Sequence, residues 1–409
     1  MSGFTANGCA VSGISNLPTA IVLGVDTPIG LTVVRELGWH KVPVVAIGRS
    51  AGAIGGASRF ASELVIRPAD RLLVDWLPEF IRETKAAALF AISENDLIEL
   101  AELPSVIEGC QILTPRKAQL DVVLDKSRTM EIARGAGISV PDSWQPVAGE
   151  DIAARIAKAN FPVAVKWSDP PSVVATLAAA GIALEKVEYA ATALALSAIL
   201  QRYDRLGQYP LVQTYCAGKG LGQMLLMANG KTVLGFQHQR LREYPASGGV
   251  STLCESVALS EHAEQMKRSE ALLREIGWEG PAMVEYRFDR ATGQYWLMEI
   301  NGRFWGSLPL AHQCGVHFAW EHYRAAVLGK GDDTPRPYRL RRARYLIPDT
   351  RRLIEQMRSS SANKQQEIFD YVADFFDPRT GYYVWSARDL RPLLRDVQNI
   401  VRRYLRSGS

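Results

Sequence analysis

Cysteines, long apolar runs and net charge are all scarce in this 409-residue sequence. Its five cysteines are scattered, without a CxxC pair or the ligand spacing of a zinc site, so we expect reduced thiols in a cytoplasmic protein. No apolar run reaches the roughly 18 residues that span a bilayer. A net charge of +4 is too small to indicate nucleic-acid binding. These absences exclude a disulfide-based scaffold and argue against a transmembrane protein or a nucleic-acid partner.

The sequence also has no internal repeat and no low-complexity tract. Residues 1–18 lack the basic start and apolar core of a signal peptide, and we expect them to form a flexible leader. Hydrophobic residues make up 47% of the chain and charged residues 22%, as in ordinary globular proteins. The length therefore predicts two or three domains with cores of their own.

Residues 19–48 have the pattern of a buried strand, a glycine-bearing turn, a helix and a second buried strand. Such a unit is typical of a parallel sheet. Its turn, residues 24–30, resembles a nucleotide-binding loop but departs from GxGxxG. We interpret it as plain turn chemistry, with a bound ligand as the alternative. Further strand and helix patterns extend this α/β region to about residue 115.

The middle of the chain alternates helices and strands that carry two lysines. Asp125 can cap a helix that begins with Lys126, and residues 161–169 predict a strand with Lys166 near its end. An alanine-rich stretch, residues 172–203, predicts helix, and residues 209–218 predict another strand. From there to residue 302 short strands dominate, including a hairpin that turns at Asn229 and Gly230.

Residues 282–303 predict a hairpin with an acidic face. A turn centred on Thr292 and Gly293 places Glu285 opposite Glu299, with Asn301 on the same face. Two opposed carboxylates need a positive group between them, and oxygen ligands with an amide suit Mg²⁺. The alternative is a solvated face with unrelated acids. The expected buried face consists of Val284, Tyr286, Phe288, Trp296, Met298 and Ile300.

Four segments, in this order, resemble those of the ATP-grasp superfamily of carboxylate ligases, which includes D-alanine–D-alanine ligase, biotin carboxylase and carbamoyl-phosphate synthetase. VLDKSRTMEIARGAGISVP resembles the segment that opens the family's ATP-binding half, and FPVAVKWSD resembles the strand with its phosphate-binding lysine. PLVQTYCAGKGLGQMLL resembles its adenine-binding hinge, and MEINGRFWGS its E-x-N-x-R metal and catalytic signature. The resemblance covers roughly residues 20–330.

The resemblance implies a mixed α/β and α+β fold. A pre-ATP-grasp domain with a Rossmann-like parallel sheet would precede a two-lobed ATP-grasp fold, and a C-terminal helical extension would follow. The expected boundaries are a leader at 1–18, the pre-ATP-grasp domain at 19–115, a first lobe at 116–208, a second lobe with the metal and catalytic site at 209–330, and a basic extension at 331–409.

The resemblance also implies a nucleotide site. Lys126 and Lys166 would reach the α- and β-phosphates of ATP, although either lysine alone would more often be a surface charge. Thr214 stands where many relatives carry an acid, and Gln223 is a candidate substitute for the missing ribose contact. The backbone that would pair with adenine belongs to Gln213, Thr214, Tyr215 and Cys216.

Metal and catalytic roles follow the same resemblance. Glu285, Glu299 and Asn301 would hold two Mg²⁺ ions, with Mn²⁺ as an alternative, and Arg303 would stabilise the transferring phosphoryl group. Arg240 is a candidate partner for phosphate or for a substrate carboxylate.

The segments around these candidates leave several alternatives open. Residues 236–257 form a glycine-containing loop between polar strands that can close over a substrate. Its Gly248, Gly249 and Ser251 would offer donors to the acceptor substrate. Gly218, Gly220 and Gly222 indicate either a phosphate lid or a hairpin, with the hairpin preferred. His238, His312 and His317 are interpreted as structural.

Residues 331–409 lie outside the resemblance and are rich in arginine. Their last helix can lie as a basic amphipathic helix on an anionic membrane, as a peripheral contact. It can instead dock its apolar stripe onto its own protein, which is the preferred interpretation. The stripe consists of Leu390, Leu393, Leu394, Val397, Ile400 and Tyr404, with Arg391, Arg395, Arg402 and Arg406 elsewhere around the helix.

Together these features predict a cytoplasmic ATP-dependent ligase that joins a carboxylate to an amine through an acyl phosphate. Its expected partners are small-molecule substrates, with a homodimer as the assembly. One alternative keeps the fold and changes the acceptor to bicarbonate or a thiol, although the sequence has no biotin-carrier segment. The other alternative is a non-catalytic nucleotide-binding regulator.

Overall fold

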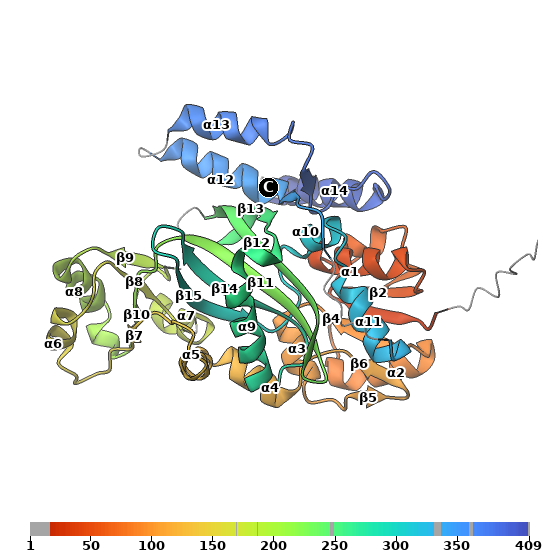
Figure 1. Ribbon diagram of the computed structural model, residues 1–409, viewed down its shortest axis with the longest axis horizontal. Coiled ribbons are helices and arrows are strands. Elements are labelled where there is room, and N and C mark those ends of the chain that lie inside the picture. The colour runs from red at the N-terminus through yellow and green to blue at the C-terminus, as the bar shows by residue number, and fades with distance from the viewer. Residues whose placement is uncertain are drawn as a thin grey trace, which may run out of the picture. The chain divides into compact units, whose positions relative to one another are not determined.

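The structure is a computed structural model, which describes residues 17–168, 170–185, 187–245, 249–330, 337–359 and 363–407 (Figure 1). The chain divides into two compact units. Unit 1 comprises residues 1–114, 317–331 and 384–409, and unit 2 comprises residues 115–316 and 332–383. Among the described residues, no helix combines the length and hydropathy of a membrane-spanning segment.

Unit 1 is built on a six-stranded sheet in the order β3-β2-β1-β4-β6-β5, parallel except for the short edge strand β5. β1 and β4 are entirely buried because they lie in the middle of the sheet. The strands are β1 (Ala20–Leu23), β2 (Val44–Gly48), β3 (Glu63–Ile66), β4 (Ala88–Ala91), β5 (Val106–Ile107) and β6 (Cys110–Ile112). The helices are α1 (Pro28–Trp39), α2 (Leu73–Thr84), α3 (Glu94–Leu100), α11 (Phe318–Leu328) and α14 (Arg391–Ser407).

The glycine-bearing turn between β1 and α1 has a packing explanation. Thr27 caps α1 by accepting a hydrogen bond from the Gly30 amide. A Cβ on Gly30 would lie 2.6 Å from the Gly24 carbonyl oxygen, so only glycine allows the helix to start this close to the strand. Asp26 accepts from the Arg49 amide, which ties the turn to the end of β2. These contacts agree with the interpretation as plain turn chemistry.

Unit 2 contains a four-stranded antiparallel sheet in the order β7-β10-β8-β9. The alanine-rich stretch predicted to be one helix forms two helices, α7 and α8. Gly181, with a φ of +69°, follows the end of α7, and the strand β9 lies between the two helices. Trp167 and Tyr203 meet edge to face in the core of this part. The strands are β7 (Ser143–Trp144), β8 (Val163–Lys166), β9 (Glu188–Ala190) and β10 (Leu211–Thr214), and the helices are α6 (Ile152–Ala157), α7 (Pro170–Ala179) and α8 (Ala193–Gln201).

The second sheet of unit 2 has seven strands in the order β15-β14-β11-β12-β13-β16-β17. The predicted hairpin at Asn229 and Gly230 joins β11 to β12, and both residues have positive φ, as a tight turn requires. The strands are β11 (Lys219–Ala228), β12 (Lys231–Tyr244), β13 (Val250–Ser256), β14 (Gly280–Asp289), β15 (Gln294–Asn301), β16 (Arg342–Arg344) and β17 (Thr380–Tyr382). The accompanying helices are α4 (Lys117–Leu124), α5 (Lys126–Gly135), α9 (Ala263–Glu275), α10 (Leu308–Gln313), α12 (Leu346–Arg358) and α13 (Lys364–Ala373).

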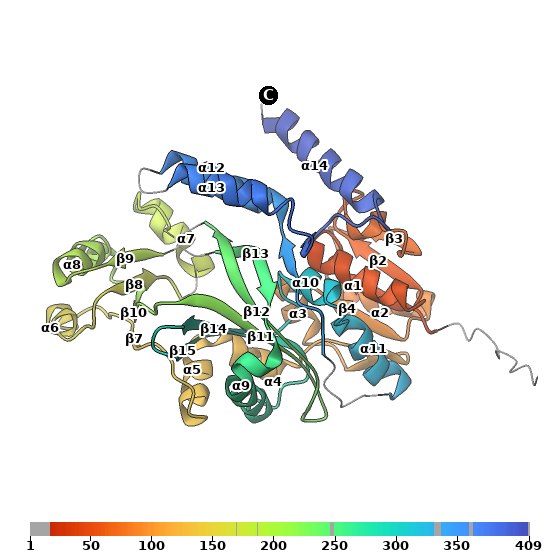
Figure 2. The same ribbon diagram turned by 45° about the horizontal axis from the view of Figure 1, so that its top comes forward.

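The C-terminal extension, which was expected to be only helical, contributes two strands to this sheet. β16 pairs with β13 and then with β17, and the helices α12 and α13 lie between these two strands in the chain. The two helices run side by side in both ribbon views (Figure 2). Residues 332–383 of the extension therefore belong to unit 2, whereas residues 384–409, which include α14, belong to unit 1.

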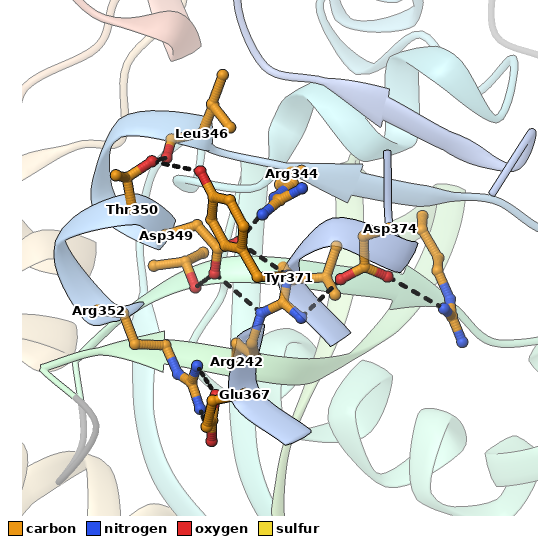
Figure 3. A network of polar contacts seen from close by, with 12 residues as sticks. Arg242, Arg344, Leu346, Asp349, Thr350, Arg352, Glu367, Tyr371 and Asp374 are labelled. Carbon is orange, nitrogen blue, oxygen red and sulfur yellow. Dashed lines mark hydrogen bonds and ion pairs between the residues drawn. The ribbon is translucent and has the colours of Figure 1, made fainter. Parts of the chain in front are cut away.

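A buried ionic network joins α12 and α13 to the sheet (Figure 3). Asp349 accepts from Arg242 at 2.9 and 2.8 Å and from Arg344 at 2.7 Å. Arg242 also pairs with Asp374 of the α13 end at 2.6 Å, and the Arg344 guanidinium lies 4.0 Å from the Tyr371 ring centroid. Burial raises the pKa of Asp349, but the arginines outweigh it and the pKa lies below its usual value.

Replacing Asp349 by asparagine tests this network. Because the Asp349→Asn variant removes the carboxylate partner of the buried Arg344 and leaves Arg242 with Asp374 alone, we expect the free energy of unfolding to fall by about 3 to 5 kcal/mol. The measurement is urea unfolding at neutral pH. The exposed pair Lys267–Glu264 supplies the control, since Glu264→Gln removes a carboxylate from the surface and should change little.

The pH dependence of stability gives a second readout of the same group. A carboxyl with a depressed folded pKa stabilises the fold above its unfolded pKa of about 3.9 and loses that contribution as pH falls. The wild type should therefore lose more stability than Asp349→Asn between about pH 5 and pH 2. Equal pH slopes for the two proteins would contradict the network.

Candidate functional site

The predicted pair of opposed acids is present: Glu285 of β14 lies directly opposite Glu299 of β15. The register near the turn, with Asp289 opposite Gln294, would by itself place Glu285 opposite Met298. An irregularity in the pairing after Tyr286 and Leu297 inserts one extra residue into β15, which brings Glu299 into place. The predicted pairing of Glu285 with Glu299 is confirmed, but it results from the bulge in β15 and not from the position of the turn.

The bulge changes the predicted buried face of the hairpin. Val284, Tyr286 and Ile300 are buried as expected. Leu297, which the regular alternation placed on the other face, is fully buried opposite Tyr286, whereas Trp296 and Met298 are only half-buried. Trp296 and Met298 were predicted to be buried because the bulge, which shifts the alternation by one residue on β15 only, cannot be seen in the sequence.

Cations neutralise both carboxylates. The Arg240 guanidinium lies 2.5 Å from Glu285, and the Lys126 ammonium lies 3.5 Å from Glu299. Burial raises the pKa of Glu285, and Arg240 offsets this only in part. At Glu299 burial also raises the pKa, but Lys126 and Asn301 outweigh it, so that the pKa lies below its usual value. The positive charge that two opposed acids require is thus supplied by side chains.

Both predicted lysines lie at this pair of acids. Asp125 caps α5 by accepting from the Arg128 amide at 3.1 Å, and this fixes Lys126 in the first turn of the helix. Lys166, at the end of β8, donates to the Gln213 amide oxygen at 2.8 Å. Burial and the charge of Lys126 lower the pKa of Lys166, while Glu299 raises it in part. The helix α5 and the strand β8 therefore bring the two lysines to the carboxylates.

Glycines in β11 make room for this arrangement. A Cβ on Gly220 would lie 2.8 Å from Cδ of Arg240, and one on Gly222 would lie 2.7 Å from Nε2 of His238. The side chains of Arg240 and His238 on β12 therefore lie over β11 at its two glycines, where β11 has no side chain. Gly220 and Gly222 lie in a paired strand, as the hairpin interpretation predicted, and not in a lid.

Two charged residues of the site were missed at the level of sequence. Glu243 pairs with Arg240 at 3.5 Å and with Arg287 at 3.6 Å. Arg287 follows Glu285 by two residues on β14, so strand alternation alone would have placed it on the same face. We refer to Arg240, Glu243, Glu285, Arg287 and Glu299 as the charged face of the seven-stranded sheet.

Gln223 does not join the charged face. It is fully buried on β11, and its amide contacts Ser269 of α9 and Gln237 of β12. Since Gly222 pairs with Glu285, its neighbour Gln223 must point to the opposite side of the sheet, where α9 packs. The prediction that Gln223 contacts the ribose was therefore wrong. The sequence of this glycine-rich segment does not show which side of the sheet each of its side chains faces.

The hinge segment lies on β10 and just after it. Gln213 is buried, and the Thr214 and Tyr215 amides donate to the carbonyls of Asp142 and Pro162 at 2.8 and 3.0 Å. Burial raises the pKa of the Cys216 thiol to about 11, so the sulfur is protonated at neutral pH. The segment is thus held in place by its own backbone hydrogen bonds.

The remaining catalytic candidates differ in placement. Arg303 follows the end of β15, is half-buried, and donates to the Phe304 carbonyl at 3.1 Å. The residue before Arg303 is Gly302, where a Cβ would lie 2.4 Å from the Trp278 ring, so this position has no room for a side chain. His238 is buried, its Nδ1 lies 3.1 Å from the Ser307 hydroxyl, and burial lowers its pKa to about 3. This histidine is neutral at physiological pH, which agrees with its interpretation as structural.

The charged face offers an oxygen donor set for a hard cation. Glu285 and Glu299 provide carboxylates, and Asn301, which donates to Glu299 at 3.2 Å, provides an amide. Mg²⁺ is commonly bound by one or two carboxylates together with phosphate oxygens and water. Among the described residues, no three histidine, cysteine or acidic side chains converge into a complete metal cage. The residues present fit Mg²⁺ that arrives with a phosphate ligand.

Comparisons with known proteins agree with this geometry. Residues 247–331 match the family described as carbamoyl-phosphate synthase L chain, ATP binding domain. A search of curated proteins gives no match.

Solved structures with similar folds include three of low sequence identity. N5-carboxyaminoimidazole synthetase from Staphylococcus aureus is 15% identical, with a TM-score of 0.61 over 83% of this chain and 85% of that one. L-amino acid ligase from Bacillus licheniformis is 14% identical, with a TM-score of 0.58 over 79% of each chain. The biotin carboxylase domain of 2-oxoglutarate carboxylase from Hydrogenobacter thermophilus is 14% identical, with a TM-score of 0.59 over 78% of this chain and 71% of that one.

The family match falls on the strand pair that carries Glu285 and Glu299, and the structural matches extend over about four fifths of the chain. The sequence resemblance and the fold therefore agree. The family match over residues 247–331 and the fold that the chain shares with these enzymes indicate the ATP-grasp superfamily.

Proposed function

We propose that this protein is an ATP-dependent ligase that joins a carboxylate to an amine through an acyl phosphate and releases ADP and phosphate. The observation that carries the proposal is the charged face, where Glu285 and Glu299 are directly opposed and Arg240 and Lys126 neutralise them. A structural salt-bridge cluster needs no directly opposed acids, whereas a site for Mg²⁺ and polyphosphate needs both acids and mobile cations.

ATP is the nucleotide in this proposal. Lys126 and Lys166 meet at the acids, and an arriving triphosphate would offer them a partner of higher charge. The adenine would lie along Gln213, Thr214, Tyr215 and Cys216. The related biotin carboxylase domain from Hydrogenobacter thermophilus is described in complex with MgADP and bicarbonate, which supports a nucleotide with magnesium here.

Magnesium would be held by Glu285, Glu299 and Asn301. When bound, Mg²⁺ supplies neutralisation of phosphate charge during phosphoryl transfer. The residues that hold it would exchange their present partners Arg240 and Lys126 for the metal and the phosphates. Because the protein already balances these acids internally, their negative charge does not destabilise the ligand-free fold.

The chemistry requires positioning more than a protein nucleophile. The substrate carboxylate attacks the γ-phosphorus of ATP, the bond to the β-phosphate oxygen breaks, and ADP leaves. The amine then attacks the acyl phosphate, phosphate leaves, and the amine proton passes to solvent or phosphate. Arg303 would stabilise the charge that develops on the transferring oxygens. Cys216 and His238 lack the charge state for nucleophile or acid catalysis at neutral pH, given their pKa values of about 11 and about 3.

Bicarbonate is a second candidate for the carboxylate. The related domain from Hydrogenobacter thermophilus is described with bicarbonate, and N5-carboxyaminoimidazole synthetase is another protein of this fold. Measuring ADP release against carboxylates paired with amines, beside labelled bicarbonate with amines, separates the two candidates. A nucleotide-binding regulator without turnover would release ADP with none of them.

The Glu299→Gln variant tests the metal role. Loss of one carboxylate ligand should lower Mg-dependent ADP release by at least about 10²-fold, the scale of the several kcal/mol that a bound metal contributes. The side chain is partly exposed, so the thermal transition should stay nearly unchanged. Glu264→Gln on α9 serves as the control, because it makes the same change at an exposed site. Full activity of Glu299→Gln would remove the metal role from the charged face.

Arg303 and Lys166 separate chemistry from binding. Arg303→Met should lower maximal turnover by about 10²-fold with little change in ATP affinity, because it meets charge that develops during transfer. Lys166→Met should mainly weaken nucleotide binding, because its partner charge is already present on ATP. Calorimetry gives the affinities, and ADP release gives the rates. A loss of affinity with an unchanged maximal rate in Arg303→Met would make this arginine a binding residue.

A further inference from the structure

The rotation of α14 about its own axis is fixed where the helix begins. Asp389, just before α14, is buried in unit 1. Its carboxylate accepts from Arg35 at 3.0 Å, from the Ser58 hydroxyl at 2.7 Å and from the Arg59 amide at 2.9 Å. Three donors on one buried carboxylate leave the first turn of the helix little freedom to rotate.

The side of α14 that contacts the rest of unit 1 is polar. Arg395 donates to the Ala51 carbonyl, and Asn399 donates to the Gly52 carbonyl at 2.8 Å. These two residues are four apart, so they share one side of the helix. Gly52 allows this approach, since a Cβ there would lie 2.9 Å from the Asn399 amide oxygen. α14 is therefore docked through backbone carbonyls and polar side chains.

The apolar side of α14 points into solvent. The preferred interpretation of the sequence, in which the apolar stripe docks on the protein, was therefore wrong for Leu390, Leu394, Val397 and Ile400, which are exposed, whereas Leu393 is half-buried. Figure 2 shows α14 extending away from the sheet of its own unit. The side chains repeat at intervals of four and three residues, as on one face of a helix. Their exposed fractions are 51% for Leu390, 61% for Leu394, 48% for Val397, 51% for Val401 and 69% for Leu405.

Arginines border this exposed stripe. Arg391 precedes Leu394 by three residues and Arg402 precedes Leu405 by three, so each lies next to the apolar side, and both are exposed. The only acidic residue of α14 is Asp396, which is half-buried. An occupant of the stripe must therefore be apolar at its centre and negatively charged at its border.

We propose that α14 binds an anionic lipid surface, with the apolar stripe in the boundary between headgroups and acyl chains and the arginines at the headgroups. A bilayer with acidic lipids has both required properties. A second copy of this chain has the wrong charge, because pairing two α14 helices would bring their arginines together. The helix would lie on the membrane with unit 1 behind it, on the side held by Arg395 and Asn399.

The full-length protein can be tested with vesicles. Phosphatidylcholine vesicles containing phosphatidylglycerol should sediment the protein, plain phosphatidylcholine vesicles should not, and added salt should release it. Arg391→Gln/Arg402→Gln should lower partitioning by about 20- to 30-fold, since each arginine near the surface contributes about 1 kcal/mol. Arg268→Gln/Arg290→Gln is the matched control, with the same loss of charge at exposed positions of α9 and of the turn between β14 and β15.

The apolar stripe is tested by Leu394→Glu/Val401→Glu. These side chains are exposed, so the thermal transition should be kept while vesicle binding is lost. No sedimentation of the wild type, or equal sedimentation of this variant, would overturn the proposal. A dimer in sedimentation velocity that this variant dissociates, without vesicle binding, would assign the stripe to a second copy. Binding to both kinds of vesicle alike would remove the role of charge.

Discussion

The pairing of Glu285 with Glu299 is the constraint on which the charged face depends. Two carboxylates directly opposed on neighbouring strands repel each other and are stable only with cations beside them. Arg240, Lys126 and Lys166 come from three separate elements, and all act on these two acids. The elements that surround the pair can be understood as the means of bringing those cations into place.

The sheet is shaped around this pair in two ways. A bulge in β15 brings Glu299 opposite Glu285, and glycines in β11 let the Arg240 side chain cross to reach Glu285. Two residues beyond Arg240, the pairing of β12 becomes irregular and Arg242 turns to the buried Asp349. The C-terminal strands and helices of unit 2 therefore hold the far end of the strand that carries Arg240.

Sequence patterns predicted the chemistry of the site better than its local geometry. The opposed acids, the cap at Asp125 and the two lysines could be predicted because each depends on spacing within one segment. Leu297 was assigned to the wrong face because a bulge in β15 interrupts the alternation. Gln223 was assigned to the wrong face because the sequence does not show which face of β11 carries the glycines and lies beside Glu285. β16 and β17 were missed because three-residue strands gain their stability from the sheet they join.

The helix α14 shows the same limit in another form. Its amphipathic pattern was recognised, but the pattern gives two sides and does not say which one faces the protein. That choice is made by Asp389, whose partners lie more than 300 positions away in the chain. Long-range contacts of this kind cannot be obtained from the spacing within a helix.

Binding of Mn²⁺ in the presence of ADP tests the central claim most directly, because Mn²⁺ replaces Mg²⁺ and is observed by electron paramagnetic resonance without any knowledge of the substrates. The account predicts that the wild type binds Mn²⁺ tightly only with ADP present, and that Glu285→Gln/Glu299→Gln loses this binding while Glu264→Gln keeps it. Undiminished Mn²⁺ binding by the double variant would contradict the assignment of the opposed carboxylates as the metal site.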